Sequence, residues 1–87
     1  MPDDLLFRGK SFEEYMYWQE QDCKTLEKVN RLLADIRRNG YKGIGKPEPL
    51  KHSQGKWSRR IDKENRIIYR IEGDTVFIYA CRHHYDD

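Results

Sequence analysis

A carboxylate held between two prolines is the first group in this sequence whose position suggests chemistry. Glu48 lies between Pro47 and Pro49 in the stretch GKPEPLKH. Pro47 has a fixed φ and Pro49 biases Glu48 away from helical geometry, so we expect the carboxylate to project from a stiff, extended segment. Two nearby lysines, Lys46 and Lys51, would favour its ionised form, which is the form that a general base must have.

RNA cleavage by internal transesterification uses groups of this kind. The 2′-hydroxyl attacks its own phosphate, so the enzyme needs a base for the hydroxyl, an acid for the departing 5′-oxygen and cations around the phosphorane. Glu48 fits the base, and His84, with a reference pKa of about 6.5, fits the acid. Arg66 and Lys51 can contact the phosphate, and Tyr85 can orient or stack on a base. The reaction needs no metal or cofactor. Lone residues of these types are also common surface groups, and that interpretation stays open.

Other kinds of site fit the spacing less well. The Cys81-Arg-His-His84 stretch has soft ligands but lacks the paired spacing of a zinc knuckle, so we expect no metal site. GIGKPEP has no following helix, and its prolines remove the amides that a phosphate-binding loop needs. A Ser-His-Asp triad is compatible with the spacing, but nothing marks Ser53 or Ser58 as activated.

The length and charge distribution of the chain indicate what kind of protein carries these residues. The chain has 87 residues, and we expect one domain over residues 1–87. Residues 1–22 carry two bases and six acids, a balance of −4, whereas residues 42–70 carry nine bases and three acids, a balance of +6. This asymmetry favours an anionic partner such as nucleic acid, or is a solvated basic surface. No apolar run approaches the roughly 20 residues of a membrane span, so we expect a cytoplasmic protein without membrane contact.

Two helices are predicted in the first half of the chain. Ser11-Phe-Glu-Glu14 has the form of a capping box, which predicts a helix that begins there, with Glu14 on its solvent side. Asp22 can cap a second helix, which Gly40 ends. Its apolar stripe is Leu26, Val29, Leu32, Leu33 and Ile36. Residues 40–56 are rich in Gly, Pro and Lys and predict a long loop of functional weight.

Three strands are predicted in the second half, after a brief edge strand at residues 5–7. Their ranges are 56–62, 66–72 and 75–81. A three-residue loop with Asn65 left-handed would place Ile61 opposite Ile67 and Arg60 opposite Ile68. The covered face would then hold Trp57, Arg59, Ile61, Ile67, Tyr69 and Ile71, and the open, basic face Ser58, Arg60, Asp62, Arg66, Ile68 and Arg70.

The dipeptide Gly73-Asp74 suits a tight turn into the last strand. Val76, Ile78 and Ala80 would join the covered face, and Phe77, Tyr79 and Cys81 the open face. Aromatic rings beside the open-face arginines would suit stacking on exposed bases, or would belong to a second core layer or a dimer interface.

Four stretches, taken together and in order, resemble the YoeB/Txe toxins of the RelE superfamily. They are EEYMYWQEQD, GIGKPEPLKH, KWSRRIDKENRIIYRI and the terminal RHHY, and the likeness runs from about residue 5 to residue 85. The resemblance implies an α+β fold in which two N-terminal helices pack on an antiparallel sheet. It also implies a ribosome-dependent mRNA endoribonuclease of a type II toxin–antitoxin system, which cleaves mRNA in the ribosomal A site and inhibits translation.

The resemblance also implies site residues and partners. Its motifs place the catalytic set at Glu48, Arg66, His84 and Tyr85, and RNA or phosphate contacts at Lys51 and Arg60. The implied partners are a YefM-type antitoxin, the bacterial ribosome and mRNA, a second copy in a homodimer, and operator DNA through the antitoxin complex alone.

The chain departs from the family pattern in two places. Asp86-Asp87 follows the terminal His-Tyr pair and would favour a protonated His84 if it lies close. His83 stands where the family often has an aromatic residue, so either histidine can be the acid. The alternative functions are a non-cleaving toxin relative that blocks the ribosome or another target, and a chain that acts mainly as the corepressor of its antitoxin.

Overall fold

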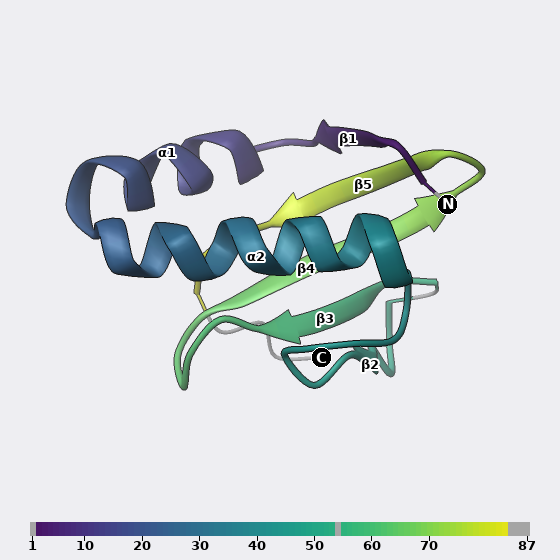
Figure 1. Cartoon of the computed structure of the whole chain (residues 1–87). Helices are drawn as coiled ribbons and strands as arrows, with labels where there is room; N and C mark the ends of the chain where they lie inside the picture. Colours follow the sequence, from purple (N-terminus) through teal and green to yellow (C-terminus); the bar gives the residue numbers. More distant parts are fainter. Residues whose placement is uncertain (1, 54, 84–87) are drawn as a thin grey trace.

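Two helices and five strands make up the part of the chain that this computed structural model describes, residues 2–53 and 55–83. The helices are α1 (Ser11–Gln21) and α2 (Cys23–Asn39), and the strands are β1 (Asp4–Phe7), β2 (Glu48–Pro49), β3 (Trp57–Arg60), β4 (Arg66–Glu72) and β5 (Thr75–Ala80). The strands form one sheet in the order β1-β5-β4-β3-β2 (Figure 1). The α+β class is confirmed, and the sheet is mixed because β1 runs parallel to β5.

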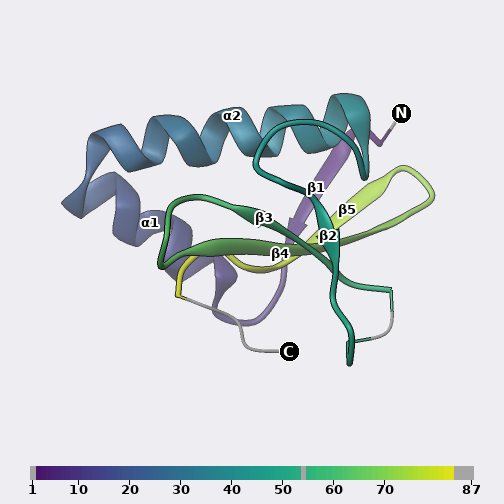
Figure 2. The same cartoon turned by 90° about the horizontal axis from the view of Figure 1, so that it is seen from below.

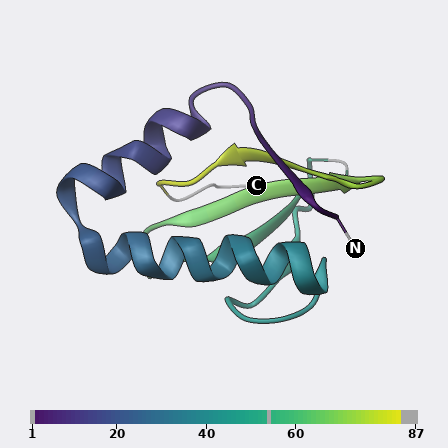
Figure 3. The same ribbon diagram turned by 45° about the horizontal axis from the view of Figure 1, so that its top comes forward.

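Helix α2 lies along one side of the sheet, and α1 packs beside it and against β5 (Figure 2). The two helices meet at the turn between them and diverge from there (Figure 3). Asp22 Oδ1 accepts a hydrogen bond from Thr25 N at 3.1 Å, and Gly40, with φ 68°, ends α2, so both predicted boundaries of this helix are confirmed. The core contains Trp18, Val29, Leu32, Leu33, Ile36, Ile61, Ile67, Tyr69, Val76, Ile78 and Cys81.

Helix α1 begins where predicted, but the predicted capping box is wrong. Ser11 is fully buried, and its Oγ donates to Ile78 O at 2.9 Å. Glu14 does not simply face water, because it accepts a hydrogen bond from Cys81 N at 2.8 Å. The N-cap position belongs to Lys10, which makes no side-chain cap. The two residues of the supposed box therefore tie α1 to β5 and to the segment that follows it.

The predicted division of β3 and β4 residues between two faces is confirmed, but the register is wrong by two residues, and the predicted open face is not open throughout, because Ser58 and Ile68 are buried. Arg60 pairs with Arg66 and not with Ile68. Asp62 Oδ1 accepts hydrogen bonds from the amides of residues 64 and 65, both at 2.8 Å, and so closes a longer turn in which Asn65 does not have a positive φ. A shift of two residues keeps every side chain on its face, which is why the faces survive the error.

Strand β5 contains an irregularity that reverses two predicted orientations. Its register with β4 shifts between Ile68 and Tyr69, so that Ala80 and not Tyr79 lies opposite Ile68. The extra residue, a β-bulge, turns Ala80 to the open face. Cys81 consequently enters the core, where it is fully buried.

The face of β3 and β4 that is turned away from α2 carries none of the described helices (Figure 2). The segment 40–56, predicted as a loop throughout, contributes the two-residue strand β2 to the edge of this sheet. Such a short pairing leaves no periodicity to detect. Neither described helix combines the length and apolar character needed to cross a membrane.

Candidate active site

Glu48 lies on the edge strand β2, directly opposite Ser58 of β3. Pro49 beside it has no amide to donate to a ladder, which suits an edge strand. Residues directly opposite each other share a face of the sheet, so Glu48 projects on the same open face as Ser58. Glu48 is exposed, and within residues 2–53 and 55–83 its carboxylate takes part in no hydrogen bond or ion pair.

Arg66 reaches the same place from β4. Its Nη1 donates to Ser58 Oγ at 3.1 Å, so the guanidinium lies over β3, and Ser58 is fully buried. Neighbouring strands are about 4.8 Å apart, which places β4 about 10 Å from β2, and the Arg66 side chain reaches over the intervening strand β3 as far as Ser58. Glu48 and Arg66 therefore both adjoin Ser58, Glu48 as its partner in the sheet and Arg66 through a hydrogen bond.

Arg60 pairs directly with Arg66 across β3 and β4. Like charges in opposite positions repel each other, and an anionic group between them would relieve that repulsion. Both residues are half-buried, and neither guanidinium has an ion pair in the described part of the chain. The pair is suited to hold a phosphate or a phosphorane.

The segment Cys81–His83 is anchored beside Arg66 through its backbone. Trp18 Nε1 donates to Cys81 O at 2.7 Å. His83 N donates to Asn65 Oδ1 at 2.7 Å, and His83 O accepts from Arg66 N at 3.1 Å. The chain therefore arrives at the start of β4 by residue 83. Outside the described residues lie the predicted site residues His84 and Tyr85 and the two terminal aspartates.

Lys51 is exposed in the turn between β2 and β3. A hydrogen bond of 2.9 Å from Leu50 N to Lys56 O closes this turn, and Lys56 Nζ lies 4.2 Å from the centroid of the Tyr79 ring. Among the described residues, the Lys51 side chain makes no hydrogen bond or ion pair with Glu48 or any other group. Lys51 thus follows Glu48 closely in the sequence, but among the described residues their side chains do not interact.

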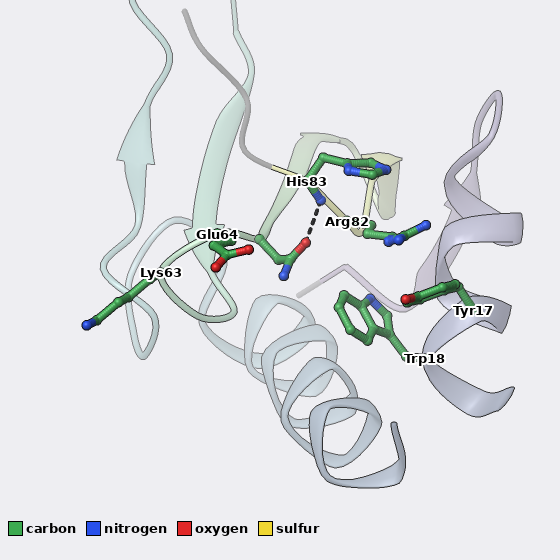
Figure 4. A pocket seen from close by; sticks show the side chains of 7 residues that line it. Tyr17, Trp18, Lys63, Glu64, Arg82 and His83 are labelled. Atoms are coloured by element: carbon green, nitrogen blue, oxygen red, sulfur yellow. Dashed lines mark hydrogen bonds between the residues drawn. The ribbon is translucent and has the colours of Figure 1, made fainter. Parts of the chain in front are cut away.

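A pocket of about 510 Å³ opens beside the anchored C-terminal segment (Figure 4). Its lining residues are Tyr17, Trp18, Lys63, Glu64, Asn65, Arg82 and His83. One wall is a cation–π pair, with the Arg82 guanidinium carbon 3.5 Å from the centroid of the Tyr17 ring. The predicted residues Glu48 and Arg66 are not part of this lining, so the pocket adjoins the open-face site without containing it.

Cys81, the softest of the candidate metal ligands, lies in the core. Burial, together with the nearby Glu14 carboxylate, raises the pKa of its thiol to about 12. The thiol therefore stays protonated near neutral pH, whereas metal binding needs the thiolate. Within the described ranges, no three His, Cys, Asp or Glu side chains gather as a metal-ligand set.

Sequence reasoning missed two residues that shape this site. Ser58, the hydrogen-bond partner of Arg66, lies on the predicted open face, but a serine gives no charge signal. Arg59 lies on the predicted covered face, and its isolation there among apolar residues was the signal that a buried charge needs partners. Both roles follow from the contacts that each residue makes with neighbouring elements, Ser58 with Arg66 and Arg59 with Asp35.

Three comparisons place the chain among known proteins. The family described as "YoeB-like toxin of bacterial type II toxin-antitoxin system" matches residues 7–85. Toxin YoeB of Escherichia coli strain K12 is 48% identical over 82 residues, which cover 93% of this chain and 98% of that protein. The solved YoeB dimer from Staphylococcus aureus gives a TM-score of 0.90 at 41% identity and covers 98% of this chain and 100% of that one.

A heterotetrameric YoeB–YefM toxin–antitoxin complex from Staphylococcus aureus is similar as well, with a TM-score of 0.85 at 42% identity over 98% of this chain and 100% of that one. The family match and the relatives extend over almost the whole sequence. The chain belongs to the YoeB-like toxins of bacterial type II toxin–antitoxin systems.

Proposed function

We propose that this chain is a ribosome-dependent mRNA endoribonuclease that inhibits translation by cleaving mRNA in the ribosomal A site. The observation that supports the proposal most directly is the convergence of Glu48 and Arg66 around Ser58 on the open face. Together with Arg60, this face offers, within the described part of the chain, a carboxylate without an ion pair and two guanidinium groups where an RNA strand can reach them. These are the groups that a phosphate-transfer reaction needs.

Cleavage would proceed by transesterification without a metal or cofactor. Glu48 takes the proton of the 2′-hydroxyl, whose oxygen attacks the adjacent phosphorus. Arg66 and Arg60 stabilise the negative charge of the phosphorane. His84 donates a proton to the departing 5′-oxygen, which leaves a 2′,3′-cyclic phosphate on one fragment and a free hydroxyl on the other.

Lys51 and Tyr85 complete the proposed site. The ammonium group of Lys51, on the turn that follows β2, would hold a neighbouring phosphate as a point charge. Tyr85 would stack on a base next to the scissile bond, since single-stranded RNA is commonly held by aromatic rings. In this proposal a single domain, residues 1–87, provides the whole active site.

The proposed partners follow from the relatives. Because the Staphylococcus aureus relative was solved both as a dimer and with YefM, we propose that this chain forms a homodimer and is neutralised by a YefM-type antitoxin. The complex would regulate its own operon, with operator DNA bound only through the antitoxin. The free toxin would act in the cytoplasm on ribosomes and mRNA.

Cut-site mapping in a purified translation reaction tests this function. Wild-type protein should cut messages at the A-site codon, and addition of the cognate antitoxin should stop the cutting. Glu48→Gln should slow cleavage by about 10² or more with ribosome binding intact, because only the base is lost. Glu27→Gln makes the same change at an exposed position of α2 and should keep the wild-type rate.

The non-cleaving alternative gives a different result in the same reaction. A wild-type protein that stalls ribosomes while every message stays intact would show that the chain is a binder and that the enzyme proposal is wrong. Equal rates for Glu48→Gln and Glu27→Gln would show that the carboxylate on β2 is not the base.

A further inference from the structure

Arg59 is a fully buried arginine directly behind the proposed site. Its chain neighbours Ser58 and Arg60 face the open side, so Arg59 points to the covered side, toward α2. Burial of a guanidinium is unfavourable unless the group is paired and fully hydrogen-bonded. The partners that offset this cost show which segments Arg59 holds.

All five N–H donors of the Arg59 side chain have an acceptor. Nη1 pairs with the Asp35 carboxylate and donates to Ile44 O at 2.9 Å, Nη2 donates to Gly40 O and Lys42 O at 2.8 Å each, and Nε donates to Tyr69 Oη at 3.2 Å. Three of these acceptors are backbone carbonyls of residues 40–44, the segment that leads from α2 toward β2. Arg59 therefore gathers this segment onto the sheet.

Asp35 of α2 also binds the segment 40–44 through a hydrogen bond. Its carboxylate accepts hydrogen bonds from Ile44 N at 3.1 Å and from Asn39 Nδ2 at 2.6 Å. Burial by itself would raise the pKa of Asp35, but the hydrogen bonds from Arg59, Ile44 and Asn39 outweigh burial and lower this pKa below its usual value. We refer to Arg59, Asp35 and residues 40–44 together as the Arg59 clamp.

The clamped segment passes too close to its neighbours to carry side chains at two glycines. A Cβ on Gly43 would collide with Asp35 Oδ2, and a Cβ on Gly45 would lie 2.6 Å from a leucine methyl group of α2. Gly45 O also accepts a hydrogen bond from Arg60 N at 2.7 Å. The path of the chain is thus fixed up to three residues before Glu48.

We propose that Arg59 is a positioning residue that sets where Glu48 stands relative to Arg66. Strand β2 has only two residues, so its pairing with β3 gives this segment little support of its own. The inference rests on the proposed function, in which Glu48 is the general base. Loss of the clamp would move the carboxylate without removing any group that touches RNA, and a displacement of about 1 Å can cost about 10²-fold in rate.

Arg59→Lys tests this role. Lysine keeps the positive charge beside Asp35 but has three N–H donors in place of five. At a temperature where unfolding curves show the variant to be fully folded, kcat should fall by about tenfold or more with KM nearly unchanged. Val29→Ala removes core volume about 9 Å along α2 from Asp35, and as a control for lost stability it should keep the wild-type kcat.

A double-mutant cycle identifies the residue through which Arg59 acts. If Arg59 works by placing the Glu48 carboxylate, Arg59→Lys should lower the residual rate of Glu48→Gln by less than about twofold. The same factor in both backgrounds would overturn the inference, because Arg59 would then act on another group. Retention of the wild-type kcat by folded Arg59→Lys would overturn it as well.

Hydrogen exchange separates this inference from the proposed function. Arg59→Lys should accelerate exchange of the amides of residues 44–50 by about tenfold or more and leave β4 and β5 unchanged, since local opening is set by local contacts. Uniform acceleration would show that Arg59 only stabilises the core. If wild-type protein cuts no message, the proposed function is wrong, and exchange alone decides whether Arg59 positions this segment.

A second variant covers the case in which Arg59→Lys does not fold. Gly43→Ala would place a methyl group against the Asp35 carboxylate and 3.2 Å from Arg59 Nη1, at a backbone φ of 127° that strains alanine, so it should disturb the clamp without changing either charged side chain. It should reproduce both the loss of kcat and the local exchange at residues 44–50. Wild-type kcat and wild-type exchange in Gly43→Ala would contradict the inference.

Discussion

At the scale of residues, two adjacent histidines are candidates for the general acid. The backbone of His83 has φ 73° and is held between Asn65 and Arg66. His84, the next residue in the sequence, lies outside the described residues. Their side chains therefore have to be distinguished by experiment.

His84→Gln should slow cleavage by about 10², because the 5′-oxygen would depart without a proton donor, and ribosome binding should be little changed. His83→Gln is the matched control and should change the rate by less than about threefold. Cut-site mapping and single-turnover rates provide the measurement. A larger loss in His83→Gln would assign the acid to His83.

The sequence pattern placed two of the charged residues on the correct face of the sheet but did not predict their partners. Alternation put Arg60 and Arg66 on one face, and this survived the register error because a shift of two residues preserves the face. Glu48 was recognised from its prolines, but its position opposite Ser58 depends on a strand too short to leave a pattern. The partners of Arg59 come from a helix and a loop that are distant in sequence.

At the scale of elements, α1 is positioned by contacts that resemble a cap in sequence. Ser11 and Glu14 have the spacing of a capping box, yet each bonds to a backbone group of β5 or of the residue after it. The same two residue types serve both arrangements, and only the location of β5 distinguishes them. The bulge of β5 could not be predicted for a similar reason, since an extra residue is visible only against the partner strand.

Ser11→Asp distinguishes the two arrangements by stability. Aspartate is as good an N-cap as serine, so a capping role would tolerate it. Because Ser11 is fully buried against Ile78 O, the carboxylate should instead lower the free energy of unfolding by about 3 kcal/mol or more. Lys10→Asp at the exposed N-cap position is the control and should be neutral or stabilising.

Urea unfolding of both variants provides the measurement, with the midpoint and the slope compared separately. Equal stability of Ser11→Asp and Lys10→Asp would mean that Ser11 is a cap after all, and that its bond to β5 contributes little.

At the scale of the whole molecule, folding divides the basic residues of the 42–70 segment. Arg59 is neutralised in the interior, and Arg70 pairs with a glutamate of its own strand at 2.6 Å. Arg60, Arg66 and Lys51 remain exposed or half-buried without an ion pair in the described part of the chain. The charge available to an anionic partner is therefore smaller than the composition suggests, and part of it lies around Glu48.

This division predicts which lysines and arginines govern the salt dependence of RNA binding. Removal of one phosphate-binding side chain should make the slope of log association constant against log salt shallower by about 0.7 to 1, so Lys51→Ala and Arg60→Ala should each show such a change. Binding to programmed ribosomes is measured from about 50 to 200 mM salt, in a Glu48→Gln background that keeps the message intact. Lys28→Ala removes a positive charge at an exposed position of α2, on the other face of the sheet, and should leave the slope unchanged.

Two outcomes would contradict this prediction. An equal change of slope in Lys28→Ala would show that net charge rather than the open face attracts the RNA. Unchanged slopes in Lys51→Ala and Arg60→Ala would remove both residues from the proposed phosphate contacts.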